Sequence, residues 1–98
     1  MTEINIYFGR QTKEGQIIEE NQFLDFLRLF VNPIFEDYTI FPSIGVWKNS
    51  QEPTTVMQIL TNNDRREDVV NICHKYCELW LQECVMVTYK EVEMRLYN

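Results

Sequence analysis

The sequence predicts an α+β fold of the ferredoxin-like class, in which two helices cover one face of a four-stranded antiparallel sheet. Near both ends of the chain, apolar and polar residues alternate as in half-buried strands. Two internal segments carry apolar residues at helical spacing, and two strand-like segments lie between them. The order is therefore β-α-β-β-α-β, and right-handed crossovers place both helices on the same face. The length predicts one domain over residues 1–98.

The first strand is predicted at residues 4–9, where Ile4, Ile6 and Phe8 alternate with other side chains. A helix is predicted over residues 20–31. Its apolar stripe has the spacing i, i+3, i+4, i+7 and i+8 and consists of Phe23, Phe26, Leu27, Phe30 and Val31. Because a proline disfavours helical geometry at the residue before it, Pro33 should end this helix.

Residues 37–48 are predicted to form an edge strand that is bulged or bent near Pro42, because Pro42 and Gly45 are unsuited to a regular central strand. A polar connection over residues 48–53 leads to a partner strand at 54–61, which is rich in β-branched residues. The alternation in this strand allows two outward-facing sets, either Val56, Gln58 and Leu60 or Thr55, Met57 and Ile59.

A second helix is predicted over residues 64–82, and Asp64 and Glu67 have the spacing of a capping box at its start. The last strand is predicted at residues 83–89. The tail at 92–97 alternates as well, and it either extends this strand or forms a short extra one.

The formal net charge of −6 disfavours nucleic-acid binding, because the nine basic residues are scattered along the chain. There is no apolar run of membrane-spanning length and no secretory signal at the N-terminus. Three cysteines in such a chain indicate reduced thiols rather than a disulfide framework. We therefore expect a cytoplasmic protein that neither associates with a membrane nor binds a cofactor.

Cys73, His74 and Cys77 invite a metal or nucleophile hypothesis, but adjacent helical residues do not face each other. A zinc site needs three or four ligands, and the chain has no second Cys or His pair. We expect no metal site and no catalytic residue here. Cys73 is predicted to lie in the core and Cys77 to be half-buried, while His74 pairs with Glu78 on the solvent side.

The face of the sheet that the helices leave uncovered is the predicted binding surface. Its residues are Asn5, Tyr7, Trp47, Met86 and Thr88. Aromatic residues and methionine are enriched at the centres of interfaces. This face is expected to join two copies into a homodimer, to bind a small ligand such as a nucleobase stacked on Tyr7 or Trp47, or to bind a protein partner.

The favoured function is a non-catalytic binding or regulatory module. It would use the uncovered face to sequester a small, nucleotide-like ligand or to block a protein partner, as a phage-type inhibitor does. The alternative is a small enzyme of the dimeric α+β-barrel kind, with a pocket between sheet and helices. Its polar candidates are Tyr7, Arg10, Trp47, His74 and Glu83.

Several short motifs along nearly the whole chain resemble a family of small bacterial proteins classed as a domain of unknown function. The motifs are Tyr7-Phe8-Gly9, Asn32-Pro33-Ile34-Phe35, Gly45-Val46-Trp47 with Glu52 downstream, Tyr76, and Gln82-Glu83-Cys84-Val85. The resemblance implies the same ferredoxin-like fold. It implies no activity, because none is agreed for the family. From the N-terminal residues we expect no leader of the kind that many members carry.

Overall fold

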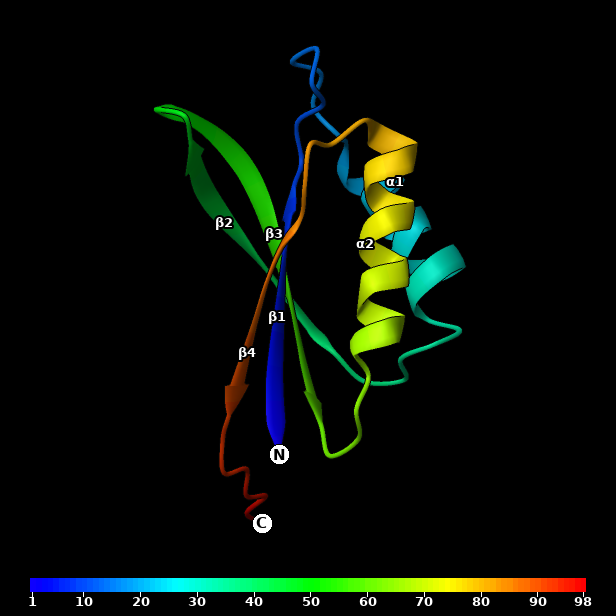
Figure 1. Cartoon of the computed structure of the whole chain (residues 1–98), viewed down its shortest axis with the longest axis vertical. Coiled ribbons are helices and arrows are strands. Elements are labelled where there is room, and N and C mark those ends of the chain that lie inside the picture. Colours follow the sequence, from blue (N-terminus) through cyan, green and yellow to red (C-terminus); the bar gives the residue numbers. More distant parts are fainter.

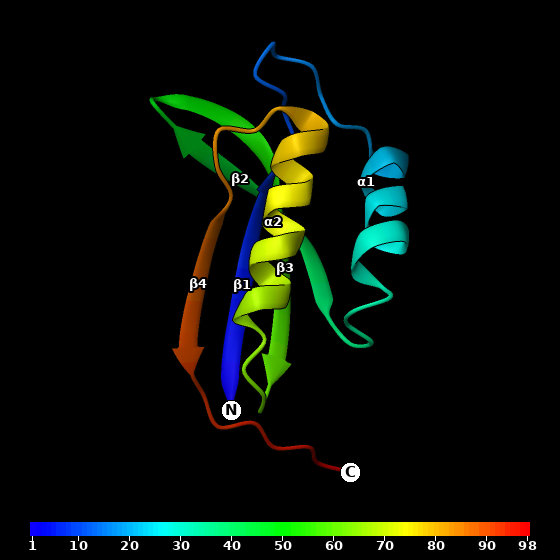
Figure 2. The ribbon, with the colours of Figure 1, turned by 45° about the vertical axis from the view of Figure 1, so that its right-hand side comes forward.

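The computed structural model describes all 98 residues and has a four-stranded antiparallel sheet in the order β2-β3-β1-β4. The strands are β1 (Thr2–Gly9), β2 (Thr39–Trp47), β3 (Ser50–Thr61) and β4 (Met86–Glu91). The helices are α1 (Glu20–Phe26), its π-helical continuation η1 (Leu27–Val31), and α2 (Arg66–Trp80). Both helices cover the same side of the sheet (Figures 1 and 2). The predicted ferredoxin-like α+β fold is therefore confirmed.

The core lies between the helices and one face of the sheet, and aromatic rings fill its centre. The fully buried rings are Phe8, Phe23, Phe26 and Tyr76. The Tyr76 ring centroid lies 4.7 Å from that of Phe8 and 5.1 Å from that of Phe26, at tilted and edge-on angles. Such pairs are favourable beyond the area that they bury. One cluster therefore fastens both helices to β1.

The helix ends differ in detail from the prediction. The capping box is at α1. There the Glu19 side chain accepts a hydrogen bond from the backbone N–H of Gln22, and the Gln22 side chain accepts one from the backbone N–H of Glu19. At α2, the Asp64 carboxylate accepts a bond of 3.1 Å from the Arg66 N–H, and Glu67 does not complete a box. The last turn of the first helix is a π-turn, in which the Asn32 N–H donates a hydrogen bond of 2.8 Å to the Leu27 carbonyl.

β2 is an edge strand, as predicted, but it has no bulge at Pro42. Each of its residues pairs with one residue of β3, and Pro42 pairs with Thr55. An edge strand accepts proline because its outer side needs no hydrogen-bond donor. The predicted connection at 48–53 is also too long. Lys48 and Asn49 have φ values of 50° and 64° and form a two-residue turn, the kind that matches the twist of a hairpin.

β4 begins at Met86, three residues later than predicted, and runs to Glu91. Residues 92–98 add no strand, although the Val92 N–H donates to the Met1 carbonyl. In β3, the outward-facing set is Val56, Gln58 and Leu60, because Met57 and Ile59 lie in the core. No helix has both the length and the apolar character needed to cross a membrane.

Candidate functional site

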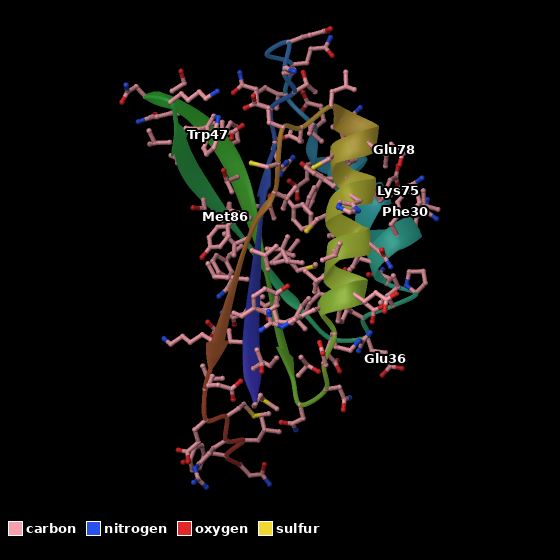
Figure 3. The ribbon with its side chains drawn as sticks, in the orientation of Figure 1. Phe30, Glu36, Trp47, Lys75, Glu78 and Met86 are labelled. Atoms are coloured by element: carbon pink, nitrogen blue, oxygen red, sulfur yellow. The ribbon has the colours of Figure 1, made fainter.

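The uncovered face of the sheet, called the outer face below, carries the predicted binding residues. Trp47 and Met86 lie on the side away from the helices (Figure 3). The register places Tyr7 between Val56 and Met86, with Phe41 on the far side of Val56. Val56 is only 4% exposed although no helix covers this face. The neighbouring aromatic side chains therefore form an apolar band across all four strands.

Polar side chains cross the outer face beside this band. The Gln58 Nε2 donates to the Asn5 Oδ1 at 3.4 Å, and the Asn5 Nδ2 donates to Glu3 at 3.0 Å. Thr88 is paired with Asn5 across β4. The side-chain amides of Asn5 and Gln58 are thus engaged with each other, whereas the exposed hydroxyl of Thr88 is available to a ligand.

On the other side of the band, the carboxylate of Glu52 in β3 packs against the backbone of Gly9 in β1. A Cβ atom added to Gly9 would lie 2.9 Å from Oε1 of Glu52, so the Glu52 carboxylate occupies the space that any other residue would fill. Gly45 likewise leaves room for the Thr54 hydroxyl, which would lie 2.8 Å from a Cβ atom added to this glycine. The two glycines, which lie on different strands, therefore leave room against the backbone for one carboxylate and one hydroxyl.

The Glu52 carboxylate makes no hydrogen bond or ion pair with another side chain. Partial burial raises its pKa above the ordinary value for a glutamate. A negatively charged group without a partner attracts a cationic ligand. The sequence motifs include Glu52, but spacing alone gives no sign that its carboxylate lies on Gly9, because this depends on the pairing of β1 with β3.

The end of β1 is held by α2 rather than by β4. Because β4 starts opposite Tyr7, the backbone carbonyls beyond that point have no partner in β4. The Tyr76 hydroxyl donates to the Gly9 carbonyl at 2.6 Å, and the Gln82 Nε2 donates to the Gln11 carbonyl at 2.7 Å. Burial raises the pKa of Tyr76, so it stays a hydrogen-bond donor. These two bonds fix the backbone on which Glu52 lies.

Replacing Tyr76 by Phe should therefore destabilise the protein without changing the packing. The Gly9 carbonyl loses its donor, which typically costs about 1–3 kcal/mol in unfolding free energy. Urea denaturation of Tyr76→Phe measures this loss. Tyr97→Phe is the matched control, because Tyr97 is 86% exposed. Equal stability of the two variants would show that the hydrogen bond has no structural role.

Arg10, a predicted polar candidate, is used within the protein. Its guanidinium donates to the Ile18 carbonyl at 2.8 and 3.1 Å, to Glu20 at 2.9 Å and to Thr55 at 3.3 Å. The same group lies over the Phe23 ring, at 5.3 Å from its centroid. Arg10 therefore anchors the loop before α1, and its donors are already engaged.

Glu83, another candidate, connects the loop after α2 to the β2–β3 hairpin. Its carboxylate lies 3.8 Å from the Lys48 ammonium, which also lies 5.8 Å from the Trp47 ring centroid. Both charged side chains are well exposed, so the pair contributes little to stability. It brings one cation and one anion to the end of the molecule where the β2–β3 hairpin projects away from the helices (Figure 1).

Glu83 and His74 also line one hollow of about 390 Å³ between α2 and β4. All three cysteines share it: Cys73, Cys77 and Cys84. Burial raises the pKa of Cys73 to about 11, so this thiol stays protonated near neutral pH. The predicted pairing of His74 with Glu78 is absent. Glu78 lies 4.0 Å from the neighbouring Lys75 instead (Figure 3).

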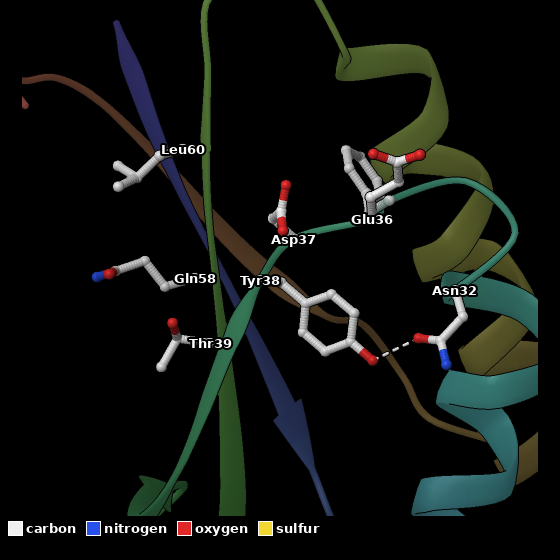
Figure 4. A pocket seen from close by; sticks show the side chains of 8 residues that line it. Asn32, Glu36, Asp37, Tyr38, Thr39, Gln58 and Leu60 are labelled. Carbon is white, nitrogen blue, oxygen red and sulfur yellow. Dashed lines mark hydrogen bonds between the residues drawn. The ribbon is translucent and has the colours of Figure 1, made fainter. Parts of the chain in front are cut away.

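A second, more open hollow of about 800 Å³ lies around the start of β2. The Tyr38 hydroxyl donates to the Asn32 Oδ1 at 2.5 Å, and partial burial raises the pKa of Tyr38. In Figure 4, Thr39 and Gln58 point away from these two residues, so the lining of the hollow lies on both sides of the strand. Its acidic residues are not arranged as a metal site, and no such cluster occurs elsewhere.

Comparison with known proteins gives a family and a fold. A family model described as "Protein of unknown function (DUF3574)" matches residues 3–96. Among solved structures, a phage SAM lyase in complex with S-methyl-5′-thioadenosine matches with a TM-score of 0.70 and 18% identity, over 92% of this chain and 80% of that chain. The apo state of a phage SAM lyase matches with a TM-score of 0.65 and 18% identity, over 99% and 92%. No curated protein matches.

These structures contradict the function that the sequence favoured. A non-catalytic binding module or phage-type inhibitor was expected, with enzyme activity as the less favoured interpretation, whereas the two matching structures are of an enzyme. Composition and periodicity give no access to this likeness, which is one of backbone fold at 18% identity. The comparison favours the alternative interpretation, a small α+β enzyme.

Proposed function

We propose that this chain, which belongs to the DUF3574 family of proteins of unknown function, is an enzyme that cleaves a carbon–sulfur bond of S-adenosylmethionine or a closely related sulfonium compound. The observation that carries the proposal is the unpaired Glu52 carboxylate, held on Gly9 beside the aromatic band of the outer face. The fold shared with a SAM lyase supports it.

A sulfonium is a cation that donates no hydrogen bond from its sulfur, so charge and polarisable surface must recognise it. A carboxylate about 4 Å from a unit positive charge gains roughly 4 kcal/mol near a protein surface before the cost of desolvation is counted. An aromatic face adds roughly 0.5–2 kcal/mol for a bound cation. Glu52 supplies the charge, and Tyr7 and Trp47 supply aromatic surface on the same face.

The adenine ring of such a substrate needs a flat apolar partner. Stacking of a base on an aromatic side chain is worth roughly 1–3 kcal/mol. Trp47 is 52% exposed on the outer face and can accept a ring there. We assign this role to Trp47. The polar pair Asn5 and Thr88, which lies next to the Tyr7–Met86 pair on β1 and β4, completes the proposed binding surface.

The chemistry suits a site that has a carboxylate but no strong acid. Methylthioadenosine is what remains of S-adenosylmethionine when the bond from sulfur to the amino-acid chain breaks. Sulfur leaves as a neutral thioether, so the leaving group needs no proton. Glu52 holds the sulfonium, and its raised pKa also suits a general base that removes a proton from the amino-acid chain during elimination.

Incubation with S-adenosylmethionine tests this proposal, with chromatography of the products. We expect methylthioadenosine and an amino-acid-derived fragment in equal amounts. An unsaturated amino acid identifies elimination, and a lactone shows that the substrate's own carboxylate displaces sulfur. If S-adenosylmethionine neither binds in calorimetry nor is consumed beyond its spontaneous decay, the proposal is wrong.

A second copy of the chain is proposed to cover the outer face, which gives a cytoplasmic homodimer. Large apolar side chains remain exposed there, namely Phe41, Trp47 and Met86 at 41, 52 and 57%. Monomeric proteins rarely leave contiguous apolar surface of this kind uncovered. Such a cover would also exclude water from a substrate bound beside Glu52, which strengthens its interaction with the carboxylate.

Solution mass measurement at micromolar concentration tests the homodimer. Met86→Glu should convert it to a monomer, because two carboxylates would meet at an isologous interface. Leu29→Glu is the matched control, since Leu29 is 54% exposed but lies on the helix side. A wild-type protein that is monomeric at these concentrations would contradict the proposal.

A further inference from the structure

The hollow between α2 and β4 holds a group of thiols that the proposed reaction does not use. Cys84 is exposed, whereas Cys73 and Cys77 are both half-buried. His74 and Glu83 also line this hollow, but neither side chain makes a hydrogen bond with a cysteine thiol. The residues do not form a metal site. The chemistry that remains for them is that of the thiols themselves.

The chain reverses its direction between Cys77 and Cys84. Leu81 adopts a left-handed conformation with φ 52°, and its N–H bonds to the Cys77 carbonyl. The Gln82 N–H also bonds to this carbonyl, at 3.2 Å. Cys84 follows only two residues later, and two residues span at most about 7 Å. The turn therefore brings Cys84 back alongside the last turn of α2, where both thiols face the same hollow.

We infer that Cys77 and Cys84 form an oxidisable dithiol, which a small disulfide such as oxidised glutathione converts into an intramolecular disulfide. The Cα separation that a disulfide needs, about 4.4–6.8 Å, lies within the reach that this turn allows. Cys73 is excluded as a partner of Cys77. Residues four apart on a helix have Cβ atoms about 5–6 Å apart, whereas a disulfide needs about 3.5–4.5 Å.

The exchange proceeds in two balanced steps. The Cys84 thiolate, which is the accessible one, attacks one sulfur of oxidised glutathione and displaces one glutathione thiolate. The Cys77 thiolate then attacks the Cys84 sulfur and displaces the second glutathione. The two protons lost by the cysteines are taken up by the two glutathione thiolates. The product ties the end of α2 to the loop that carries Glu83, the partner of Lys48.

Oxidation of the folded protein with excess oxidised glutathione tests this inference. The intact mass should fall by that of two hydrogen atoms, and one thiol of the three should remain open to alkylation. Glutamyl endopeptidase cleaves after Glu78 and Glu83, which places Cys77 and Cys84 on separate peptides. These two peptides should remain joined until a reductant is added.

Variants identify the pair. Cys73→Ser should form the same cross-link as the wild type, whereas Cys77→Ser should stop at a glutathione adduct on Cys84. Circular dichroism shows whether each variant is folded. A wild-type protein that retains glutathione on Cys84, or that links Cys73 to Cys77, would overturn the inference. Neither result depends on whether the protein cleaves S-adenosylmethionine.

Discussion

Glu52→Gln is expected to lower cleavage of S-adenosylmethionine by about 100-fold or more, the usual effect of losing a key electrostatic group in an active site. Glutamine keeps the shape of the side chain on Gly9 but removes the charge that attracts the sulfonium. Initial rates of methylthioadenosine release measure the effect. Glu36→Gln is the matched control, because Glu36 is an exposed carboxylate at the end of the molecule away from the β2–β3 hairpin.

A second variant separates the charge of Glu52 from its position. Gly9→Ala places a methyl group 2.9 Å from the carboxylate oxygen, so the flexible end of Glu52 must move while the sheet can stay unchanged. We expect activity to fall with little loss of stability. Wild-type activity in both Glu52→Gln and Gly9→Ala would show that the reaction does not take place at the Glu52 carboxylate beside Gly9.

The raised pKa of Glu52 predicts how stability and activity depend on pH. Because the folded state disfavours the charged carboxylate, Glu52 destabilises the fold once it is ionised. That cost disappears as the pH falls through its raised pKa. Glu52→Gln should therefore unfold at a slightly higher temperature than the wild type at neutral pH. Activity should rise with pH through the same range, since the reaction uses the ionised form.

Phe26→Ala is expected to lower the free energy of unfolding by about 3–5 kcal/mol, as for other buried phenylalanines. The Phe26 ring is 2% exposed and contacts the rings of Phe8, Tyr76 and Trp80. Its removal leaves a cavity where α1, α2 and β1 meet. Since small domains are stable by only about 5–15 kcal/mol, much of this protein should be unfolded at physiological temperature.

Thermal unfolding followed by circular dichroism measures this loss, which should amount to a fall in midpoint of about 15 °C or more. Phe30→Ala is the control. Phe30 is half-buried at the edge of the cluster, with the Lys75 ammonium 5.1 Å from its ring centroid. It should lose clearly less stability. Equal losses for the two variants would show that the cluster is not centred on Phe26.

The sequence by itself determined the order of the elements and the inward faces of most of them. Alternation in residues 4–9 and the apolar stripe of residues 20–31 are local patterns, and burial of one face requires them. The sequence could not decide which face of β3 points outward, because the adjacent residues Val56 and Met57 are both apolar. Only pairing with β1 placed Met57 in the core.

Tertiary structure alone decided the candidate site. The two-residue turn at Lys48 and Asn49 lets β3 begin at Ser50, so Glu52 belongs to the strand. The pairing of β3 with β1, in which Gly9 lies opposite Thr54, then places the Glu52 carboxylate against Gly9. Cys77 and Cys84 share a hollow because the chain reverses between them. Both arrangements join residues through pairing or a turn rather than through periodicity. Helical or strand periodicity carries no record of such contacts. The physical reason is that the first depends on how the strands pair, and the second on the left-handed turn at Leu81 and on the packing of α2 against β4.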